Sequence, residues 1–516
     1  MAVLAHQRGI IQAFNHPAMR VFFLALTAVL AQQRGTNQAE NHPPFTTYAC
    51  DATGACTPES SEIVLDANWR WLNKMGTSTN CYTGDEWDTG ICPDPVTCAQ
   101  NCGLEGADYA GTYGINVQGD TMSIKLVTVG QYDTNIGART YVMDTPDTYR
   151  QFHLKNREFA FDVDVSTQPC GINGALYFVD MESDGGMSRF PTNAAGARYG
   201  TGYCDAQCPH DDKFINGEAN IVGWAPDPGG DPNSGDGKFG TCCTEMDIWE
   251  ANSVSTAVTP HMCTVSGPYR CNGTECGDGT QRFLGVCDKN GCDMNPFRLG
   301  NAGFYGPGQA PAPPAPGGCT LAPDTNNMGT IMGTPTIQTD PIGCCATCNA
   351  TAGCVGFTYV AASSMCFLKS ALGTPVADPG ATSGSIVKAG AGAGAGFTVD
   401  TTQPFTVVTQ FITSDGTDAG TLVEIRRSFV QNGVHIPSPP AQNIAGSNAS
   451  SVTDAFCKQK GVAYGDNVGL SPPPQTPFRP LHPPCVGLTR AHTTTSPLPT
   501  RRTTLRPLAA SRAWGR

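Results

Sequence analysis

Alternation of apolar and polar side chains constrains the fold of this chain more than any other feature. Between residues 157 and 165 the apolar side chains fall on one face, as Phe159, Phe161, Val163 and Val165. This period of two predicts a β-strand with one buried face. Similar patterns occur at 123–129, 174–181, 405–411 and 428–436. The last contains Asn432-Gly433, which predicts a tight hairpin. Because no long helical period appears, we expect an all-β protein with two antiparallel sheets packed face to face.

The cysteine content indicates an oxidising compartment. The chain has 24 cysteines in 516 residues, and Cys204, Cys208 and Cys242-Cys243 fit a zinc spacing only loosely. We therefore expect disulfides. Residues 19–31 begin Met-Arg, continue as a short apolar run and end Val-Leu-Ala. This pattern is typical of a cleavable signal peptide and is too short to span a bilayer. We predict an N-terminal extension and signal peptide over 1–31, and a secreted, extracellular protein.

The net charge of the chain argues against some classes of binding partner. The formal net charge is −13, which argues against binding to nucleic acid or to an anionic membrane. We expect a monomer. Secretion would expose three glycosylation sequons, at Asn272, Asn349 and Asn448.

Two low-complexity segments divide the chain. A Pro-rich stretch at 311–318 and a Gly/Ala-rich stretch at 389–396 are typical of linkers. The six cysteines between them predict a small disulfide-stapled module over 309–396. Around Cys344, Cys354 and Cys366 it resembles a PAN or apple domain. That resemblance implies a protein or carbohydrate ligand; a surface insertion without a ligand is the alternative.

The region after residue 470 changes character. Residues 471–516 are rich in Pro, Thr and Arg without strand periodicity, and such a composition does not build a core. We predict a disordered tail and interpret it as a frame or splice artefact, with a basic linker as the alternative. The expected sandwich therefore comprises 32–308 and 397–470.

Three carboxylates lie within six residues in the segment 241–253. In an extended strand Glu245 and Asp247 share a face, while Glu250 points away. A bulge between Asp247 and Glu250 would bring Glu250 round, and bulges re-aim side chains beside active sites. Three converging carboxylates raise at least one pKa and suit glycosidic bond cleavage, in which two carboxyl groups lie roughly 5–5.5 Å apart when configuration is retained. A solvated acidic edge and a calcium site are the alternatives.

The run Cys-Cys-Thr-Glu-Met-Asp-Ile-Trp-Glu-Ala-Asn-Ser at 242–253 resembles the active-site motif of glycoside hydrolase family seven, the cellobiohydrolases and endoglucanases. Further similar segments are 66–71, 170–178, 199–208 and 304–308. The resemblance extends from about 41 to 308 and from 397 to about 470. It implies a concanavalin-like jelly-roll β-sandwich with long loops that form a substrate groove or tunnel.

The resemblance also implies catalytic roles. Glu245 would be the nucleophile, Glu250 the acid and then the base, and Asp247 the residue that orients Glu245. The chemistry requires Glu250 to hold its proton while Glu245 ionises. No metal or cofactor is required.

Substrate-binding roles follow in the same way. Trp69 and Trp71 are two residues apart, so we expect them on one strand face, as sugar platforms by resemblance or as core residues by composition. By resemblance Tyr177 lines the site near the scissile bond, with an interior aromatic as the alternative. His261 matches a histidine on the leaving-group side, with a structural histidine as the alternative. The remaining residues match groups near the scissile bond or on the product side: Asn173, Asp205, Gln207, Arg282, Asp293 and Arg298.

Several positions depart from the family pattern. Asn290 replaces an acidic residue and Met294 an aromatic one on the product side. The resemblance implies that Cys292 pairs with Cys457, and that Cys170 loses its partner. Gly35 and Gly103 stand where the family has a further cysteine pair. Segments 225–240 and 271–287 are long, and the resemblance implies that such loops wall the groove into a tunnel, which favours attack from a chain end.

These observations predict a secreted, retaining hydrolase of cellulose-type β-1,4-glucan that releases cellobiose. A non-catalytic glucan-binding or adhesion protein with an inactive sandwich is the alternative.

Overall fold

The computed structural model describes residues 32–130, 133–227, 232–307, 319–351, 353–386, 397–464, 485–488 and 502–506. The predicted signal peptide, both linkers and most of the tail lie outside these residues. Within them, no helix is long and apolar enough to cross a membrane.

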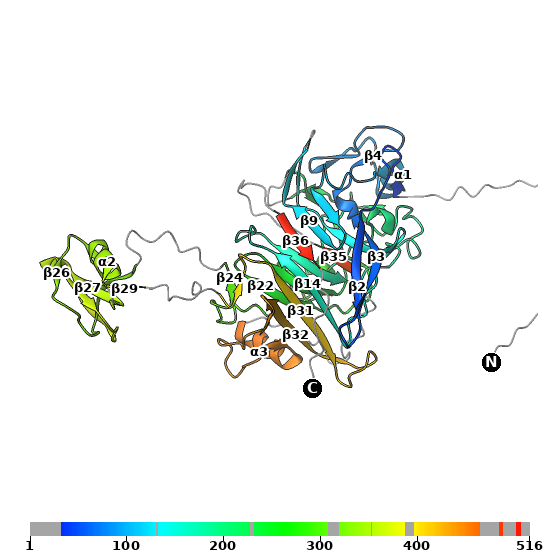
Figure 1. The fold of residues 1–516 in the computed structure, drawn as a ribbon. Helices are drawn as coiled ribbons and strands as arrows, with labels where there is room; N and C mark the ends of the chain where they lie inside the picture. The colour runs from blue at the N-terminus through cyan, green and yellow to red at the C-terminus, as the bar shows by residue number, and fades with distance from the viewer. Residues whose placement is uncertain are drawn as a thin grey trace, which may run out of the picture.

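Two eight-stranded sheets form the body of the molecule (Figure 1). Within each sheet all neighbouring strands are antiparallel. The first sheet has the order β2 (Pro44–Cys50), β3 (Cys56–Leu65), β12 (Thr140–Thr145), β35 (Cys485–Leu488), β15 (Gly174–Val179), β21 (Glu245–Ala251) and β22 (Thr256–His261), with β13 (Thr148–Tyr149) beside β12. The second has the order β33 (Val434–Pro437), β32 (Leu422–Gln431), β31 (Phe405–Thr413), β14 (Arg157–Asp164), β36 (Arg502–Arg506), β9 (Thr121–Lys125) and β8 (Ile115–Gln118), with β34 (Ser451–Val452) beside β32.

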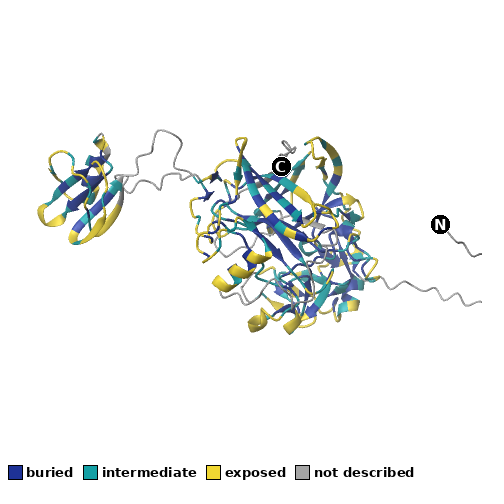
Figure 2. Ribbon diagram, turned by 90° about the horizontal axis from the view of Figure 1, so that it is seen from below, coloured by how far each residue is buried: buried dark blue, intermediate teal, exposed yellow. Residues whose placement is uncertain are grey.

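The main core lies between these sheets and confirms the predicted β-sandwich. Phe161 and Val163 from β14 pack in one cluster with Leu176 and Phe178 from β15. Buried residues of both sheets therefore pack against one another, and Figure 2 shows the buried residues of the sandwich in dark blue. The opposite face of β15 carries Tyr177, which belongs to a second buried cluster. This second face is the one that holds the candidate site.

Most predicted strands are present, with small differences at their ends. The segment 123–129 is divided between β9 and β10 (Val127–Val129). The predicted hairpin joins β32 to β33, and Asn432 and Gly433 both have positive φ, at 52° and 76°. These values suit a turn whose twist matches its strands.

Helices and small ribbons complete the described chain. The α-helices are α1 (Pro95–Asn101), α2 (Pro341–Ala350) and α3 (Asp454–Tyr464). The 3-10 helices are η1 (Ala67–Trp69), η2 (Ala197–Tyr199), η3 (Gly273–Cys276), η4 (Gly279–Gln281) and η5 (Ala361–Ser363). The remaining short strands are β1 (Gln33–Arg34), β4 (Leu72–Lys74), β5 (Tyr82–Thr83), β6 (Glu86–Trp87), β7 (Cys102–Leu104), β11 (Thr134–Ile136), β16 (Phe214–Ile215), β17 (Glu218–Ala219), β18 (Ala225–Pro226), β19 (Gly235–Asp236), β20 (Phe239–Cys242), β23 (Tyr269–Asn272), β24 (Tyr305–Gly306) and β30 (Val399–Asp400).

The segment between the linkers forms a sheet of its own. Its five strands have the order β25 (Cys319–Asn327), β29 (Pro375–Ile386), β27 (Gly356–Val360), β28 (Met365–Lys369) and β26 (Thr336–Ile337). Helix α2 contributes to a separate buried cluster, and Figure 1 shows this unit apart from the sandwich. Strands β24 and β30 flank the insertion and pair with each other. The insertion therefore leaves and re-enters the sandwich at neighbouring positions.

The predicted disordered tail differs from the structure in two segments. Strand β35 pairs with both β12 and β15, and β36 pairs with both β14 and β9. Each occupies an interior position of a sheet, where neighbouring strands on both sides would otherwise leave main-chain groups without partners. The composition of 471–516 did not predict these two strands. Strand pairing uses main-chain N–H and C=O groups, which every residue other than proline has, so composition does not exclude it.

Disulfides staple the loops, as the cysteine count predicted. The described bridges join 50–56, 81–102, 92–98, 204–243, 208–242, 263–287, 271–276, 292–457, 344–366 and 348–354. Cys292 therefore pairs with Cys457, and Cys170 is free and exposed among the described cysteines, as expected. Cys204, Cys208, Cys242 and Cys243 form disulfides with one another, which leaves no thiolate there for zinc.

A carboxylate holds the N-terminal segment where the cysteine pair is missing. Glu105 accepts hydrogen bonds from the main-chain N–H groups of Thr36, Asn37 and Gln38, at 3.1, 2.9 and 2.8 Å. A Cβ placed on Gly35 would lie 2.2 Å from the Glu105 carboxyl carbon. A side chain at residue 35 and the Glu105 clamp thus exclude each other.

Candidate active site

Strand β21 carries a bulge at the predicted place. Asp247 pairs with Thr259 on β22, whereas Glu250 pairs with Ala257, so β21 has one extra residue between them. The same irregularity appears opposite β15. Consequently Ile248 and Trp249, although adjacent, are both fully buried in the main core.

This packing decides which face Glu250 occupies. With Ile248 and Trp249 both in the core, Glu250 lies on the outer face with Glu245 and Asp247. The charge of Asp247 is the leading cause of the raised pKa of Glu250, and that of Glu250 contributes to the raised pKa of Glu245. The three carboxylates therefore form one electrostatic cluster, as the spacing predicted.

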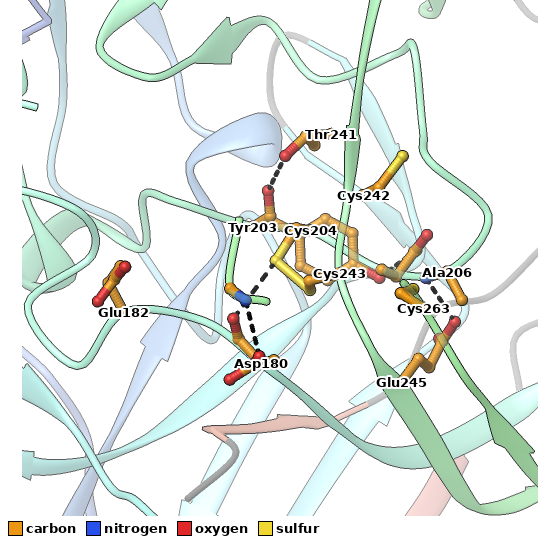
Figure 3. Close-up of a disulfide and its surroundings, with 12 residues drawn as sticks. Asp180, Glu182, Tyr203, Cys204, Ala206, Thr241, Cys242, Cys243, Glu245 and Cys263 are labelled. Carbon is orange, nitrogen blue, oxygen red and sulfur yellow. Dashed lines mark hydrogen bonds between the residues drawn. A yellow bond between two sulfur atoms is a disulfide. The ribbon is translucent and has the colours of Figure 1, made fainter. Parts of the chain in front are cut away.

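Two adjacent disulfides place a main-chain donor on Glu245. Cys204–Cys243 and Cys208–Cys242 join the segment 204–208 to residues 242 and 243, just before β21. Between them, the N–H of Ala206 donates to Oε2 of Glu245 at 3.0 Å (Figure 3). This bond fixes the orientation of the carboxyl group and favours its ionised form.

Glu250 has a different environment. Its Oε1 atom accepts a 2.8 Å hydrogen bond from the side-chain amide of Asn173. The neighbouring charge of Asp247, followed by burial, raises the pKa of Glu250 to about 7. A carboxyl group that keeps its proton to this pH is suited to general acid catalysis.

Asp247 forms a buried ion pair with His261. Nε2 of His261 lies 3.0 Å from Oδ2 of Asp247, and Nδ1 lies 2.8 Å from the carbonyl oxygen of Asp288. Burial opposes the imidazolium, but the hydrogen bond to Asp247 and its charge, the hydrogen bond to Asp288 and the charge of Glu250 together outweigh burial and raise the pKa of His261 to about 9. Both ring nitrogens therefore donate protons to oxygen acceptors.

The pairing of His261 with Asp247 makes this cluster a poor metal site. Glu245, Asp247 and His261 have ligand atoms within 4.8 Å of one another. A metal would need a lone pair on one imidazole nitrogen, and both are engaged as donors. The cluster is better suited to proton transfer than to holding a cation.

The environment of Glu245 opposes its ionisation. Burial first, and then the charges of Asp247 and Asp205, raise the pKa of Glu245 well above its ordinary value, whereas the predicted role of nucleophile requires Glu245 to ionise. These carboxyl groups share one field, so ionising one raises the proton affinity of the others. Attack by Glu245 therefore requires that it first lose a proton, and the N–H of Ala206 favours that loss.

A buried chain of hydroxyl groups supports the segment that carries Ala206. The hydroxyl groups of Tyr177 and Tyr203 are 3.2 Å apart, and Tyr203 donates to Asp205. The N–H of Gln207 donates to the other Asp205 oxygen at 2.8 Å. Tyr177 and Asp205 are both buried; Tyr177 is thus an interior aromatic that also belongs to the site.

The prediction that Trp69 and Trp71 share a strand face is wrong. Trp69 ends the 3-10 helix η1, and Trp71 precedes β4. Trp69 is partly buried, with its indole N–H 3.3 Å from the carbonyl oxygen of Ile136, whereas Trp71 is exposed and donates to Asn80 at 2.8 Å. The side chain of Asp66 caps η1 through the N–H of Asn68, which ends the strand period at this point.

The predicted product-side residues form two groups. Arg282 donates to Asn290 at 2.8 Å and to the carbonyl oxygen of Lys289 at 3.2 Å, and that oxygen also accepts from Gln207. The second group is the ion pair of Arg298 with Asp293, at 3.0 Å. Asn290 thus holds Arg282, and Met294 is buried in the main core, where it cannot serve as an exposed platform.

Comparison with known proteins decides the family. The sequence profile of glycosyl hydrolase family 7 matches residues 34–312 and 389–471, which is more than half of the chain. The chain belongs to glycosyl hydrolase family 7. A family 7 cellobiohydrolase from Daphnia pulex is 37% identical, with a TM-score of 0.68 over 92% of this chain and 86% of that one.

Two further solved structures match over the same share of this chain. The cellobiohydrolase of Melanocarpus albomyces, solved with cellotetraose, is 35% identical, with a TM-score of 0.65 over 92% of this chain and 85% of that one. The endocellulase of Humicola insolens is 28% identical, with a TM-score of 0.58 over 92% of this chain and 87% of that one. The chain is thus a glycoside hydrolase by family, and its relatives include both cellobiohydrolases and an endocellulase.

Sequence reasoning missed four groups of this family 7 site. Tyr203 and the Ala206 N–H lie inside the segment 199–208, which was singled out without roles for them. Arg139 is buried between the rings of Tyr203 and Trp69, at 3.2 and 5.3 Å from their centroids. Lys460 pairs with Asp293. Arg139 and Lys460 lie far from the motif in sequence, so no local pattern indicates them.

Proposed function

We propose that this protein is a secreted retaining hydrolase of β-1,4-glucan that acts on cellulose or a related polymer. Glu245 attacks the anomeric carbon, and Glu250 donates its proton to the leaving oxygen. Glu250 then takes a proton from water as the glycosyl-enzyme is hydrolysed. Asp247, held by His261, orients Glu245.

One observation carries this proposal. The extra residue in β21 brings Glu250 to the same face as Glu245 and Asp247. The register shift occurs in the pairing of β21 with both of its neighbours, β15 and β22. Without it, the acid and the nucleophile would lie on opposite faces of the sheet. The cellotetraose complex of the Melanocarpus relative supports a β-glucan substrate.

The experiment is hydrolysis of amorphous cellulose and of cellotetraose by the secreted chain. Glu245→Gln and Glu250→Gln should each lower the rate by roughly 10³-fold or more, with unchanged far-UV circular dichroism. Glu158→Gln, on the exposed start of β14, is the matched control. NMR of the first-formed product should show the β-anomer. Binding of cellulose without cleavage by the wild type would favour the non-catalytic alternative, and an α-anomer would contradict double displacement.

We also propose that action begins at a chain end. The long segments 225–240 and 271–287 support this, because loops of this length can cover a groove. Cellobiose should then dominate the soluble products from the earliest times, and a rapid loss of viscosity of a soluble glucan would contradict it. For the inserted module we propose a protein or carbohydrate ligand, tested by comparing adsorption to cellulose with and without residues 309–396.

A further inference from the structure

Helix α3 presents one face to the product side of the site. Cys457, Lys460 and Tyr464 lie three and four residues apart, so they share this face. Cys457 is disulfide-bonded to Cys292. Lys460 forms an ion pair with Asp293, and the Tyr464 hydroxyl donates to the carbonyl oxygen of Arg298 at 2.9 Å. Each of the three therefore contacts the segment 292–298.

Lys460 is the unusual member of this face. It is 3% exposed, whereas Lys458 on the same helix is exposed. Burying an ammonium group is unfavourable unless a charge and hydrogen bonds compensate it. Besides Asp293, the Nζ atom of Lys460 donates to the carbonyl oxygen of Gly291 at 3.5 Å. Lys460 thus holds the segment 291–293 at two points.

That segment packs directly against the catalytic sheet. The N–H of Cys292 donates to the carbonyl oxygen of Pro260 at 3.0 Å, and the N–H of Met294 donates to that of Val258 at 2.9 Å. A Cβ on Gly291 would lie 2.7 Å from the ring of His261. The segment therefore lies alongside β22, the strand that pairs with the Glu250 end of β21.

We propose that Lys460 is a positioning residue for the reaction, which holds and partly neutralises the Asp293 carboxylate beside the strands that carry Glu250 and His261. The inference rests on the proposed function, since it concerns the acid of that reaction.

The charges around Glu250 give the sign of the effect. Glu250 faces Asp247 and Glu245 on its own strand, His261 on β22, Asn173 before β15, and Asp293 after β22. Asp293 is itself paired with Arg298 and Lys460. Removing the ammonium leaves Asp293 less neutralised. Its charge then stabilises the protonated form of Glu250 more strongly.

The first test is the pH dependence of kcat/KM on a soluble cello-oligosaccharide. In Lys460→Met the basic limb should move up by roughly half a pH unit, because a charge that is largely compensated in the wild type becomes less so. Lys460→Arg keeps the positive charge, so its basic limb should stay at the wild-type position. Lys458→Met, on the exposed side of α3, should also leave the limb unchanged. A lower Tm without movement of the limb would mean a merely structural role and would overturn the proposal.

A second measurement does not depend on turnover. Carbon-13 NMR of labelled glutamate carboxyl groups, with the Glu250 signal assigned through Glu250→Gln, should show the same upward movement in Lys460→Met. Absence of hydrolysis by the wild type would then count against the proposed function alone. If Lys460→Met does not fold, Asp293→Asn and Asp293→Asn/Lys460→Met are compared instead. Because Lys460 acts through Asp293, the Glu250 signal should titrate alike in these two variants. A difference between the variants would overturn the proposal.

Discussion

Nε2 of His261 lies 3.0 Å from Oδ2 of Asp247, and the two side chains form a buried ion pair next to the catalytic carboxyl groups. The imidazolium of His261 compensates the buried negative charge of Asp247. The pair also links the protonation of a histidine to the stability of the fold and to the acidity of Glu250.

The first prediction concerns stability against pH. The pKa of His261 is raised to about 9 in the fold, above its ordinary value of about 6.5 when unfolded. The stabilisation from this residue is therefore fully present below about pH 6.5 and is lost as the pH rises through about 9. The free energy of unfolding, measured by urea titration, should fall over this window in the wild type and stay flatter in His261→Gln. Equal slopes in the two proteins would contradict the ion pair.

The second prediction concerns the acid. Asp247 is the leading cause of the raised pKa of Glu250. Asp247→Asn should therefore move the basic limb of the pH–rate profile down from about 7, toward the ordinary value for glutamate. The rate should also fall by roughly 10-fold to 100-fold, because Glu245 loses the neighbour that orients it. An unchanged limb would assign the acid to another residue.

The third prediction concerns the donor to Glu245. Replacing Cys204–Cys243 by two serines should lower the free energy of unfolding by about 2–4 kcal/mol and lower kcat as well, because Ala206 is no longer held against Glu245. The control is the same change in Cys50–Cys56, which joins the outer strands β2 and β3. The control should cost stability without a matching loss of kcat at a temperature where both variants are folded.

The fourth prediction concerns the N-terminal clamp. Glu105→Ala removes the acceptor of three main-chain N–H groups and should destabilise the protein by roughly 2–4 kcal/mol. Glu86→Ala, at an exposed position, should change the free energy of unfolding little. In addition, Gly35→Ala should be destabilising, since its Cβ would meet the Glu105 carboxyl group. Tolerance of both changes would show that the clamp contributes little.

Local patterns predicted the sandwich and the heart of the site. The alternation at 157–165 became β14, and the spacing of Asp247 and Glu250 required the bulge that is found. Both depend on residues a few positions apart. The placement of Trp69 and Trp71 failed because Asp66 caps a 3-10 turn there and interrupts the strand period.

Long-range relationships could not be predicted in this way. The ionisation of Glu245 depends on its burial and on Asp205, forty residues away in the sequence. Glu105 meets the N–H groups of Thr36 to Gln38 only after the chain has folded. The strands β35 and β36 were likewise not predicted, because composition records side chains and not main-chain pairing.

The interior positions of β35 and β36 have a consequence for biosynthesis. Both strands come from the last part of the chain, and their partners, β12, β15, β14 and β9, are all synthesised much earlier. Each sheet therefore lacks one interior strand during translation. Contacts between residues so far apart in the sequence also form slowly. Until β35 and β36 have left the ribosome, the two halves of the first and of the second sheet, respectively, expose unpaired edges to other chains. This nascent protein should therefore depend on chaperones longer than a protein whose sheets close in order.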